Sequence, residues 1–481
     1  MIWLRIIWGA VLAALLGYSF RRAWRLEHGT PDHSDHPFIK NRGTETYVLF
    51  PPTALFWILL IFFVMYAVSL GFDAGAVRFT ALLADIMLTL SIYFLLLLVL
   101  LPFLRKRISA RACAVLWLVP AFLSWQAHML INIIPVPTIT LYIPRRAIPV
   151  IEAVWLAGFV IVGGYYLISH LIFSREVRKN SVEETDEEVL KIWVHEQEVL
   201  DYTRPVRLLR GDVPAPFSMG RTGFSRCTVL PKHDYSPSEL SMIFRHELHH
   251  LQRGDVDTKV FLCLCRALCW FNPLVWIAAK KAAEDLERSC DEIVTTGMDD
   301  AERRTYANLL LDTAAPGRGC TTCLSAAAQT LRYRLKSVIT PRKRAAGTIL
   351  LMAAVFACVL FFGTVSLSDA KGRFSELILT ENIKISYVYD SKTYDTVKNV
   401  SPRFFEALDT IELEHITGEL RPDTANDSPH ILFSLSDGRL ATLTDRFLYL
   451  HDHTYVNRRT DCYLIRSDVD IEELKASIYT Y

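Results

Sequence analysis

The stretch His246-Glu247-Leu248-His249-His250 is a metal-binding pattern when it lies on a helix. His246 and His250 are four residues apart, so both imidazoles would project from one helix face and could bind one zinc ion. Glu247 would then be placed to take a proton from a water molecule that the metal activates. The alternative is an exposed polar helix whose histidines cluster by coincidence.

The residues just upstream predict the helix that this pattern needs. Ser236 is a suitable N-cap, Pro237 fits the first helical turn, and Glu239 completes a capping box. A helix that starts at these residues runs directly into the histidine pair. The sequence therefore supports the helical reading of the motif.

The composition indicates a membrane protein. The chain has 481 residues, enough for two or three domains, and 51% of them are hydrophobic, with a mean hydropathy of +0.24. The net charge of +1 gives no reason to expect direct binding of nucleic acid. Cys462 is alone in the polar C-terminal region, which therefore has no internal disulfide framework. Cys320-Thr321-Thr322-Cys323 is a lone CxxC, for which a reduced structural role is favoured over zinc or redox chemistry.

Five long apolar runs precede the histidine motif, and a sixth follows it. Their residues are 2–20, 53–72, 79–104, 112–134, 149–173 and 347–367. Each run approaches or exceeds the length of about 20 residues that crosses a bilayer. Arg21-Arg22 follow the first run without a small-residue cleavage site, so we predict an anchor that is retained.

The positive charges of the connecting loops predict the orientation of these runs. Lys and Arg gather after the first, third and fifth runs and just before the sixth, whereas the intervening loops carry fewer. By the positive-inside rule the richer loops are cytoplasmic. This places the N-terminus and the C-terminal region outside and the histidine motif inside. Glu152 and His170 lie within the fifth run, where they either face the bundle interior or lie near the interface.

Val260–Ala279 is another apolar stretch, but Asn272-Pro273 interrupts it near its middle. We expect two shorter helices that fold back as a hairpin, lying at or dipping into the membrane surface. The hairpin would return the chain to the histidine helix, where a catalytic zinc needs a third protein ligand. Spacing alone does not select one carboxylate from the acidic stretch 284–292.

At this point the chain resembles the BlaR/MecR family of membrane metallopeptidases in three ordered motifs. They are His-Glu-Leu-His-His at 246–250, Trp270-Phe271-Asn272-Pro273-Leu274-Val275-Trp276, and Glu287-Arg288-Ser289-Cys290-Asp291. Looser similarity covers 216–231, 306–310 and 332–339. The spans before the motif outnumber those of the simplest family layout.

The resemblance implies a role for each matching residue. His246, His250 and Glu287 would bind zinc, and Glu247 would be general base and then general acid. Asp291 would orient a zinc-binding histidine. His249 would lie beside the ligands or compete with His250 as a ligand.

The C-terminal region departs from the antibiotic sensors of that family, which end in an extracellular penicillin-binding domain. Residues 368–481 are far fewer than such a domain needs, so we expect its serine–lysine chemistry, and a β-lactam receptor, to be missing.

The same region instead predicts a small α+β domain. Strands are expected at Ile431–Ser436, Leu440–Thr444, Phe447–Leu450 and Cys462–Ile465, with helices starting at Ser401-Pro402 and covering Asp470–Tyr479. His451-Asp452-His453 is interpreted as a hydrated strand turn rather than a metal site.

These inferences predict a polytopic α-helical membrane protein with a mainly helical α+β metalloprotease domain, zincin-like by the resemblance. The expected parts are a bundle of about five transmembrane helices at 1–174, a cytoplasmic zinc metallopeptidase domain at 175–346 with a membrane-associated hairpin at 259–284, a last transmembrane helix at 347–367, and a small extracytoplasmic domain at 368–481.

The expected function is proteolysis of the chain itself or of a cytoplasmic transcriptional repressor after an outside signal. Arg303-Arg304 is one candidate position for self-cleavage. A non-proteolytic receptor with a structural zinc is the main rival, and Glu247 argues against it because a structural site needs no general base. A transporter, suggested by Glu152 and His170, lacks a visible internal repeat. The expected partners are a protein substrate, membrane lipid and an unidentified signal, and a homodimer stays open.

Overall fold

The structure is a computed structural model of the chain, and it describes most of the sequence. The described residues are 2–28, 46, 48, 52–123, 139–144, 146–220, 225–313, 322–323, 328–340, 344–361, 365–379, 384–389, 396–397, 400–417, 430–451 and 460–478. Several predicted features lie partly outside this set, at Cys320-Thr321 of the CxxC, residues 124–134 of the fourth apolar run, 221–224 of the looser similarity, 362–364 of the sixth run, Asp452-His453 and Tyr479.

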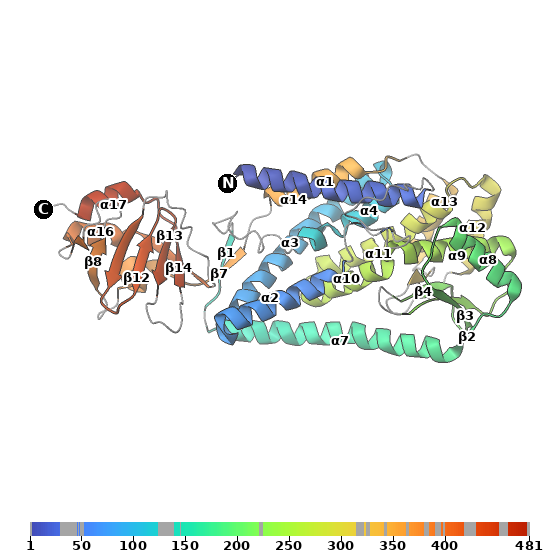
Figure 1. Cartoon of the computed structure of the whole chain (residues 1–481), viewed down its shortest axis with the longest axis horizontal. Helices are drawn as coiled ribbons and strands as arrows, with labels where there is room; N and C mark the ends of the chain where they lie inside the picture. The colour runs from blue at the N-terminus through green and yellow to red at the C-terminus, as the bar shows by residue number, and fades with distance from the viewer. Residues whose placement is uncertain are drawn as a thin grey trace.

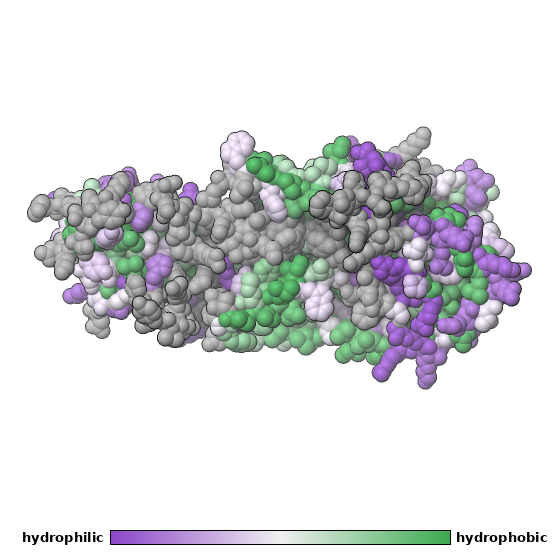
Figure 2. Space-filling model, in the orientation of Figure 1, coloured by the Kyte–Doolittle hydropathy of each residue, from purple (hydrophilic) through white to green (hydrophobic). Residues whose placement is uncertain are grey.

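Long apolar helices form the middle of the molecule. They are α1 (Ile2–Glu27), α2 (Ala54–Leu70), α3 (Phe72–Arg107), α7 (Ile148–Asn180) and α14 (Thr348–Phe361). Three segments of α1, α3 and α7 are long and apolar enough to cross a membrane, whereas the apolar parts of α2 and α14 are shorter. Figure 2 shows hydrophobic residues over this middle part and hydrophilic residues at the end where α7 meets strand β2 (Ser181–Glu183). The helices are those of a membrane protein.

Two predicted spans differ from the observed helices. The described part of the fourth run, 112–134, is split into α4 (Ala110–Leu116) and α5 (Val119–Leu123), because Pro120 has no amide to donate to the Leu116 carbonyl and instead fits the first turn of a new helix. The helix predicted at 347–367 ends at Phe361, because Val365 already belongs to strand β7 (Val365–Arg373) and pairs with strand β1 (Ile139–Tyr142).

The stretch after the histidine motif forms the predicted helical hairpin. α10 (Asp255–Leu268) and α11 (Pro273–Val294) are separated at Cys269–Asn272, and the Asn272 side chain caps α11 by accepting from the Leu274 amide. Buried residues of both helices belong to the same apolar core as α1, α3 and α14. The hairpin therefore packs into the helical bundle, and α11 then carries the chain out of that bundle.

A five-stranded sheet and several helices surround the histidine helix α9 (Pro237–Arg253). The strand order is β2-β3-β5-β4-β6, with β3 (Val206–Gly211), β4 (Phe217–Met219), β5 (Arg226–Pro231) and β6 (Thr322–Cys323). The helices are α8 (Glu187–Val199), α12 (Asp300–Asp312) and α13 (Ala328–Ile339). β4 packs against α9, which places one side of the sheet beside the histidine motif.

The C-terminal region forms the predicted α+β domain. Its helices are α15 (Phe374–Leu377), α16 (Pro402–Asp409) and α17 (Ile471–Ile478). The remaining strands are β8 (Ile385–Tyr389), β9 (Thr396–Val397), β10 (Glu412–Thr417), β11 (Ile431–Leu435), β12 (Leu440–Leu443), β13 (Phe447–His451) and β14 (Thr460–Ile465). Strands β11 to β14 and helices α16 and α17 lie where the sequence predicts them, to within a few residues.

β1 joins the C-terminal sheet from the segment between α5 and α7. The order of this nine-stranded sheet is β1-β7-β10-β14-β13-β12-β11-β8-β9, and β1 runs parallel to β7 from Ile139 to Tyr142. The sequence did not predict this strand. In Figure 1 the C-terminal domain lies at one end of α7 and α9 lies toward the other end. The sheet and the histidine motif are thus separated by the length of the bundle.

Candidate metal centre

The histidine helix starts as its sequence predicts. The Ser236 side chain accepts from the Glu239 amide, and the Glu239 carboxylate accepts from the Ser236 amide at 2.8 Å, which completes the capping box. The helix ends at Gly254, whose positive φ of 66° suits glycine. This helix carries His246 and His250 on one face, with their Nε2 atoms 3.1 Å apart and both side chains fully buried.

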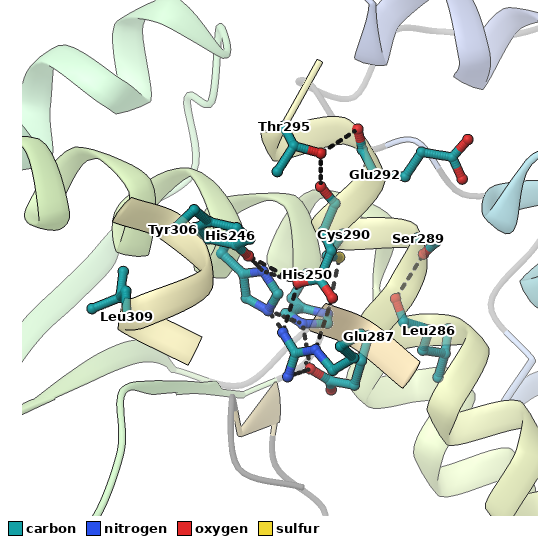
Figure 3. A network of polar contacts seen from close by, with 12 residues as sticks. His246, His250, Leu286, Glu287, Ser289, Cys290, Glu292, Thr295, Tyr306 and Leu309 are labelled. Atoms are coloured by element: carbon teal, nitrogen blue, oxygen red, sulfur yellow. Dashed lines mark hydrogen bonds and ion pairs between the residues drawn. The ribbon is translucent and has the colours of Figure 1, made fainter. Parts of the chain in front are cut away.

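Glu287 on α11 meets this histidine pair. Its Oε2 atom lies 3.6 Å from Nε2 of His246 and 3.7 Å from Nε2 of His250. The three ligand atoms lie within 4.8 Å of one another, and Figure 3 shows the two imidazoles and the carboxylate converging from two helices. The structure thus brings together the three residues that the family resemblance selects as ligands.

The donor set of this group fits a metal ion. The Oε2 atom of Glu287 is buried and has no hydrogen-bond partner among the described residues. Two imidazole nitrogens and one carboxylate oxygen are a common set of protein ligands for a catalytic zinc. A single cation between them would satisfy all three atoms at once.

The charges around the group favour metal-binding protonation states for His246 and Glu287. Burial lowers the pKa of His246 to about 4, so its imidazole is neutral at physiological pH. Burial opposes ionisation of Glu287, but Lys259 and His250 outweigh this and hold its pKa well below the ordinary value. Lys259 of α10 places its Nζ atom 3.2 Å from Oε1 of Glu287. The result is a neutral histidine facing a carboxylate.

A buried polar network holds His246 from its other side. The Tyr306 hydroxyl lies 2.9 Å from Nδ1 of His246 and donates to Asp291 at 2.8 Å. Arg334 of α13 contacts the same carboxylate with two nitrogens, at 2.7 and 2.6 Å. Its third nitrogen lies 3.4 Å from Oε2 of Glu287. Asp291 therefore reaches the histidine mainly through Tyr306, while Arg334 connects it to Glu287.

His250 has a different partner. Its Nδ1 atom lies 2.7 Å from Oδ2 of Asp255, the first residue of α10, and 3.4 Å from the sulfur of Cys290. His250, Asp255 and Cys290 form a second close group of possible ligands among the described residues, but it shares His250 with the first group. The Asp255 contact holds the ring so that Nε2 points at Glu287. Burial lowers the pKa of His250, but Cys290, Glu287 and Asp255 outweigh it and raise this pKa well above its ordinary value, so a metal would have to displace a proton from His250.

Glu247 and His249 complete the five-residue motif. Glu247 directly follows His246 in the sequence, and its side chain is fully buried. His249 lies outside both groups of possible ligands. Burial and the nearby Arg253 lower the pKa of His249 to about 3, so it is a neutral buried side chain.

Sequence reasoning missed Asp255, Lys259, Tyr306 and Arg334 as parts of the site. Tyr306 and Arg334 lie in the looser similarity at 306–310 and 332–339, which marked the segments without giving a role. Asp255 had a weak local signal, an acidic residue one position beyond the glycine that ends the histidine helix.

The C-terminal domain does contain a Ser-x-x-Lys sequence, contrary to expectation, at Ser368-Asp369-Ala370-Lys371. These residues lie on β7, where a register shift places Ser368 opposite Ile416 and Lys371 opposite Glu414, and the Ser368 hydroxyl donates to the Ala370 carbonyl at 3.4 Å. Lys371 instead pairs with Glu414 at 2.8 Å. The tetrad is therefore a sequence coincidence within a strand.

The comparisons with known proteins agree with the motif resemblance. Residues 137–338 match the family model described as BlaR1 peptidase M56. The curated Regulatory protein BlaR1 of Bacillus licheniformis is 30% identical over 162 residues, which cover 33% of this chain and 26% of the relative. The chain thus matches about a quarter of that protein.

Proposed function

We propose that residues 137–338, which match the BlaR1 peptidase M56 family model, are a peptidase, and that the chain is a zinc metalloendopeptidase of a membrane signalling system. It would cleave itself, a cytoplasmic transcriptional repressor, or both, in response to an outside signal. The observation that carries the proposal is the convergence of His246, His250 and Glu287, with Glu247 adjacent to the first of them.

The buried side chains supply the roles that peptide hydrolysis needs. When bound by the three ligands, zinc would act as a Lewis acid toward a peptide carbonyl and would lower the pKa of water. Glu247 would accept the proton from the attacking water and deliver it to the leaving amine. Tyr306 and Asp255 would orient the two imidazoles, and Arg334 would hold Glu287 and Asp291 in place.

The sheet beside α9 supports binding of an extended peptide by strand addition. β4 packs on α9, and its partner on the outer side is β6, a segment of the same chain. Phe217 pairs with Cys323 and Ser218 with Thr322 in antiparallel register. We propose that a substrate peptide pairs with β4 in the same way, and that the segment around β6 is a self-substrate.

The earlier candidate for self-cleavage, Arg303-Arg304, is less suited. Both residues lie inside α12, and the Arg303 guanidinium binds the carbonyls of Thr295, Met298 and Val338. A protease acts on extended backbone, so the helix would first have to unwind. The β6 segment is already extended.

We further propose the orientation that the loop charges predict, with the N-terminus and the C-terminal domain outside and the protease inside. β1 and β7 share a sheet, so in this proposal the α5–α7 segment and the C-terminal domain would lie on the same side of the membrane. In Figure 1 the histidine helix α9 lies toward the opposite end of α7, which supports placing the metal group on the other side. Reporter fusions after α5 and after α12 test the assignment, and both reporters on one side would contradict it.

The central experiment separates metal binding from hydrolysis. We expect Glu247→Ala to retain about one zinc per chain and to lose cleavage of a co-expressed cytoplasmic substrate, whereas His246→Ala loses both. Metal analysis of purified protein and immunoblotting of the substrate provide the two measurements. Full cleavage by zinc-loaded Glu247→Ala would contradict the role of Glu247 as general base. Cleavage that is unaffected by a chelator would mean that another protease cuts the substrate, and would favour the non-proteolytic role of the site.

A further inference from the structure

Arg253 is the last residue of the histidine helix, and it connects three parts of the molecule. Its Nη1 atom donates to Oγ of Ser289 at 2.9 Å and to the sulfur of Cys290 at 3.4 Å, both on α11. Its Nη2 atom donates to Oε2 of Glu27, the last residue of α1, at 2.7 Å. The Arg253 side chain is only 1% exposed. One guanidinium thus bridges the helix of His250, the helix of Glu287 and the first apolar helix.

Glu27 is held just as firmly. Its other oxygen, Oε1, accepts from the Thr46 hydroxyl at 2.8 Å and lies 3.2 Å from Nη2 of Arg111 on α4. The backbone amide of Thr46 donates to the carbonyl of Gln252 at 2.8 Å, so Thr46 also ties Glu27 to the end of α9. The Glu27 carboxylate therefore has one fixed place, between two buried arginines.

α1 is itself fixed along its length by α14. Gly17 leaves room for Met352, because a Cβ atom at Gly17 would lie 2.5 Å from the Met352 sulfur. Leu16 is fully buried in the same core. The end of α1 therefore has a defined position relative to the bundle. Arg253 connects this end of α1 to α9 and α11, the two helices that carry His250 and Glu287.

We propose that Arg253 is a positioning residue for the metal centre and that Glu27 of α1 sets its position. This inference rests on the proposed zinc site. Desolvation offsets much of the attraction in a buried ion pair, so this pair adds little net stability. The ion pair acts on the geometry of the site instead. The planar guanidinium fork holds the end of α9 against Ser289 and Cys290, which follow Glu287 on α11 by two and three residues. The spacing of His250 and Glu287 would depend on this fork.

The test uses the intact protein in detergent, with zinc as the probe. Glu27→Gln keeps the shape of the side chain but removes its charge, and Arg253→Lys keeps a charge but removes the fork. Leu16→Ala removes core packing on the same helix but keeps the Glu27 carboxylate and all of its contacts, and it is the matched control. Zinc affinity is measured by competition with a chromogenic chelator, and hydrolysis of a peptide that contains residues 314–327 is measured on zinc-saturated samples.

We expect Glu27→Gln and Arg253→Lys each to weaken zinc binding by about 10–100-fold, as loss of an orienting contact does at other metal sites, with Leu16→Ala near the wild-type value. Size-exclusion profiles identify the variants that fold. If only one of Glu27→Gln and Arg253→Lys folds, its zinc affinity alone is enough to test the proposal. Wild-type zinc affinity in a folded variant, or an equal loss in Leu16→Ala, would overturn the proposal. A wild-type chain that binds zinc but hydrolyses no peptide would count against the proposed function only, because the affinity measurement does not depend on hydrolysis.

Discussion

His250 and Asp255 are joined by a 2.7 Å contact between Nδ1 and a carboxylate oxygen, across the glycine that separates α9 from α10. The contact leaves Nε2 of His250 as the atom that faces His246 and Glu287. Asp255 is 1% exposed, so water does not compete for its place. The turn after the histidine helix therefore sets the orientation of one candidate ligand.

Replacing Asp255 should weaken metal binding. We expect Asp255→Asn to lower zinc affinity by about 10–100-fold, because His250 loses the charged partner that fixes its ring. Competition with a chelator measures the effect, and Asp300→Asn, at an exposed carboxylate at the start of α12, is the control. An unchanged affinity in Asp255→Asn would show that another contact orients His250.

Arg334 should matter for stability far more than its neighbour Arg332. Arg334→Leu leaves Asp291 buried without its two-nitrogen contact, which should cost about 3–5 kcal/mol of unfolding free energy. Arg332 is exposed on the same helix, so Arg332→Leu should change this free energy by less than about 0.5 kcal/mol. Denaturant unfolding followed by tryptophan fluorescence compares the two, and equal effects would contradict the role of the buried network.

His415 on β10 makes the C-terminal domain sensitive to alkaline pH. Burial lowers the pKa of His415, but hydrogen bonds with Asp369 and Asp461 outweigh it and raise the pKa to about 9. The folded pKa lies above the unfolded value of about 6.5, so the stabilisation is complete below pH 6.5 and is lost as the pH rises through 9. The shift corresponds to on the order of 3 kcal/mol.

Hydrogen–deuterium exchange of peptides from β7 and β10 measures this loss. Wild type and His415→Gln are compared at each pH, so that the intrinsic exchange rate cancels. The two proteins should differ most near pH 6 and converge above pH 9 to 10. A difference that stays constant across this range would exclude a contribution from His415 titration.

Gly158 of α7 is needed for close contact with the hairpin. A Cβ atom there would lie 2.2 Å from the Trp270 indole, whereas one at Gly164 meets nothing within 4 Å. We expect Gly158→Ala to destabilise the protein by about 1–3 kcal/mol through overpacking, and Gly164→Ala to be neutral or slightly stabilising. Thermal unfolding in detergent measures both, and equal behaviour of the two variants would show that the hairpin does not lie against Gly158.

Local signals in the sequence predicted the parts of the site that depend on neighbouring residues. The capping box at Ser236 and Glu239 and the helix break at Asn272-Pro273 both follow from short-range backbone chemistry, and the structure contains both. The choice of Glu287 among several nearby carboxylates needed the family motif, because helical spacing alone allows more than one.

Contacts between distant segments could not be predicted in this way. Arg334 reaches Asp291 from a helix 43 positions further along the chain, and no local pattern marks that pairing. β1 is a four-residue strand whose alternation is too short to stand out, and its partner β7 begins within the run predicted as the last membrane helix. In both cases the tertiary partner, rather than local propensity, determines the structure.

The pairing of β1 with β7 also sets an order of events during biosynthesis. Roughly 220 residues separate the two strands, and they include nearly all of the matched peptidase region. At a synthesis rate of about 5–20 residues per second, β1 waits on the order of 10–40 s before its partner leaves the ribosome. The nine-stranded sheet is therefore completed only after α14 and the strands that follow it have been made, so its completion is a late event in the folding of this chain.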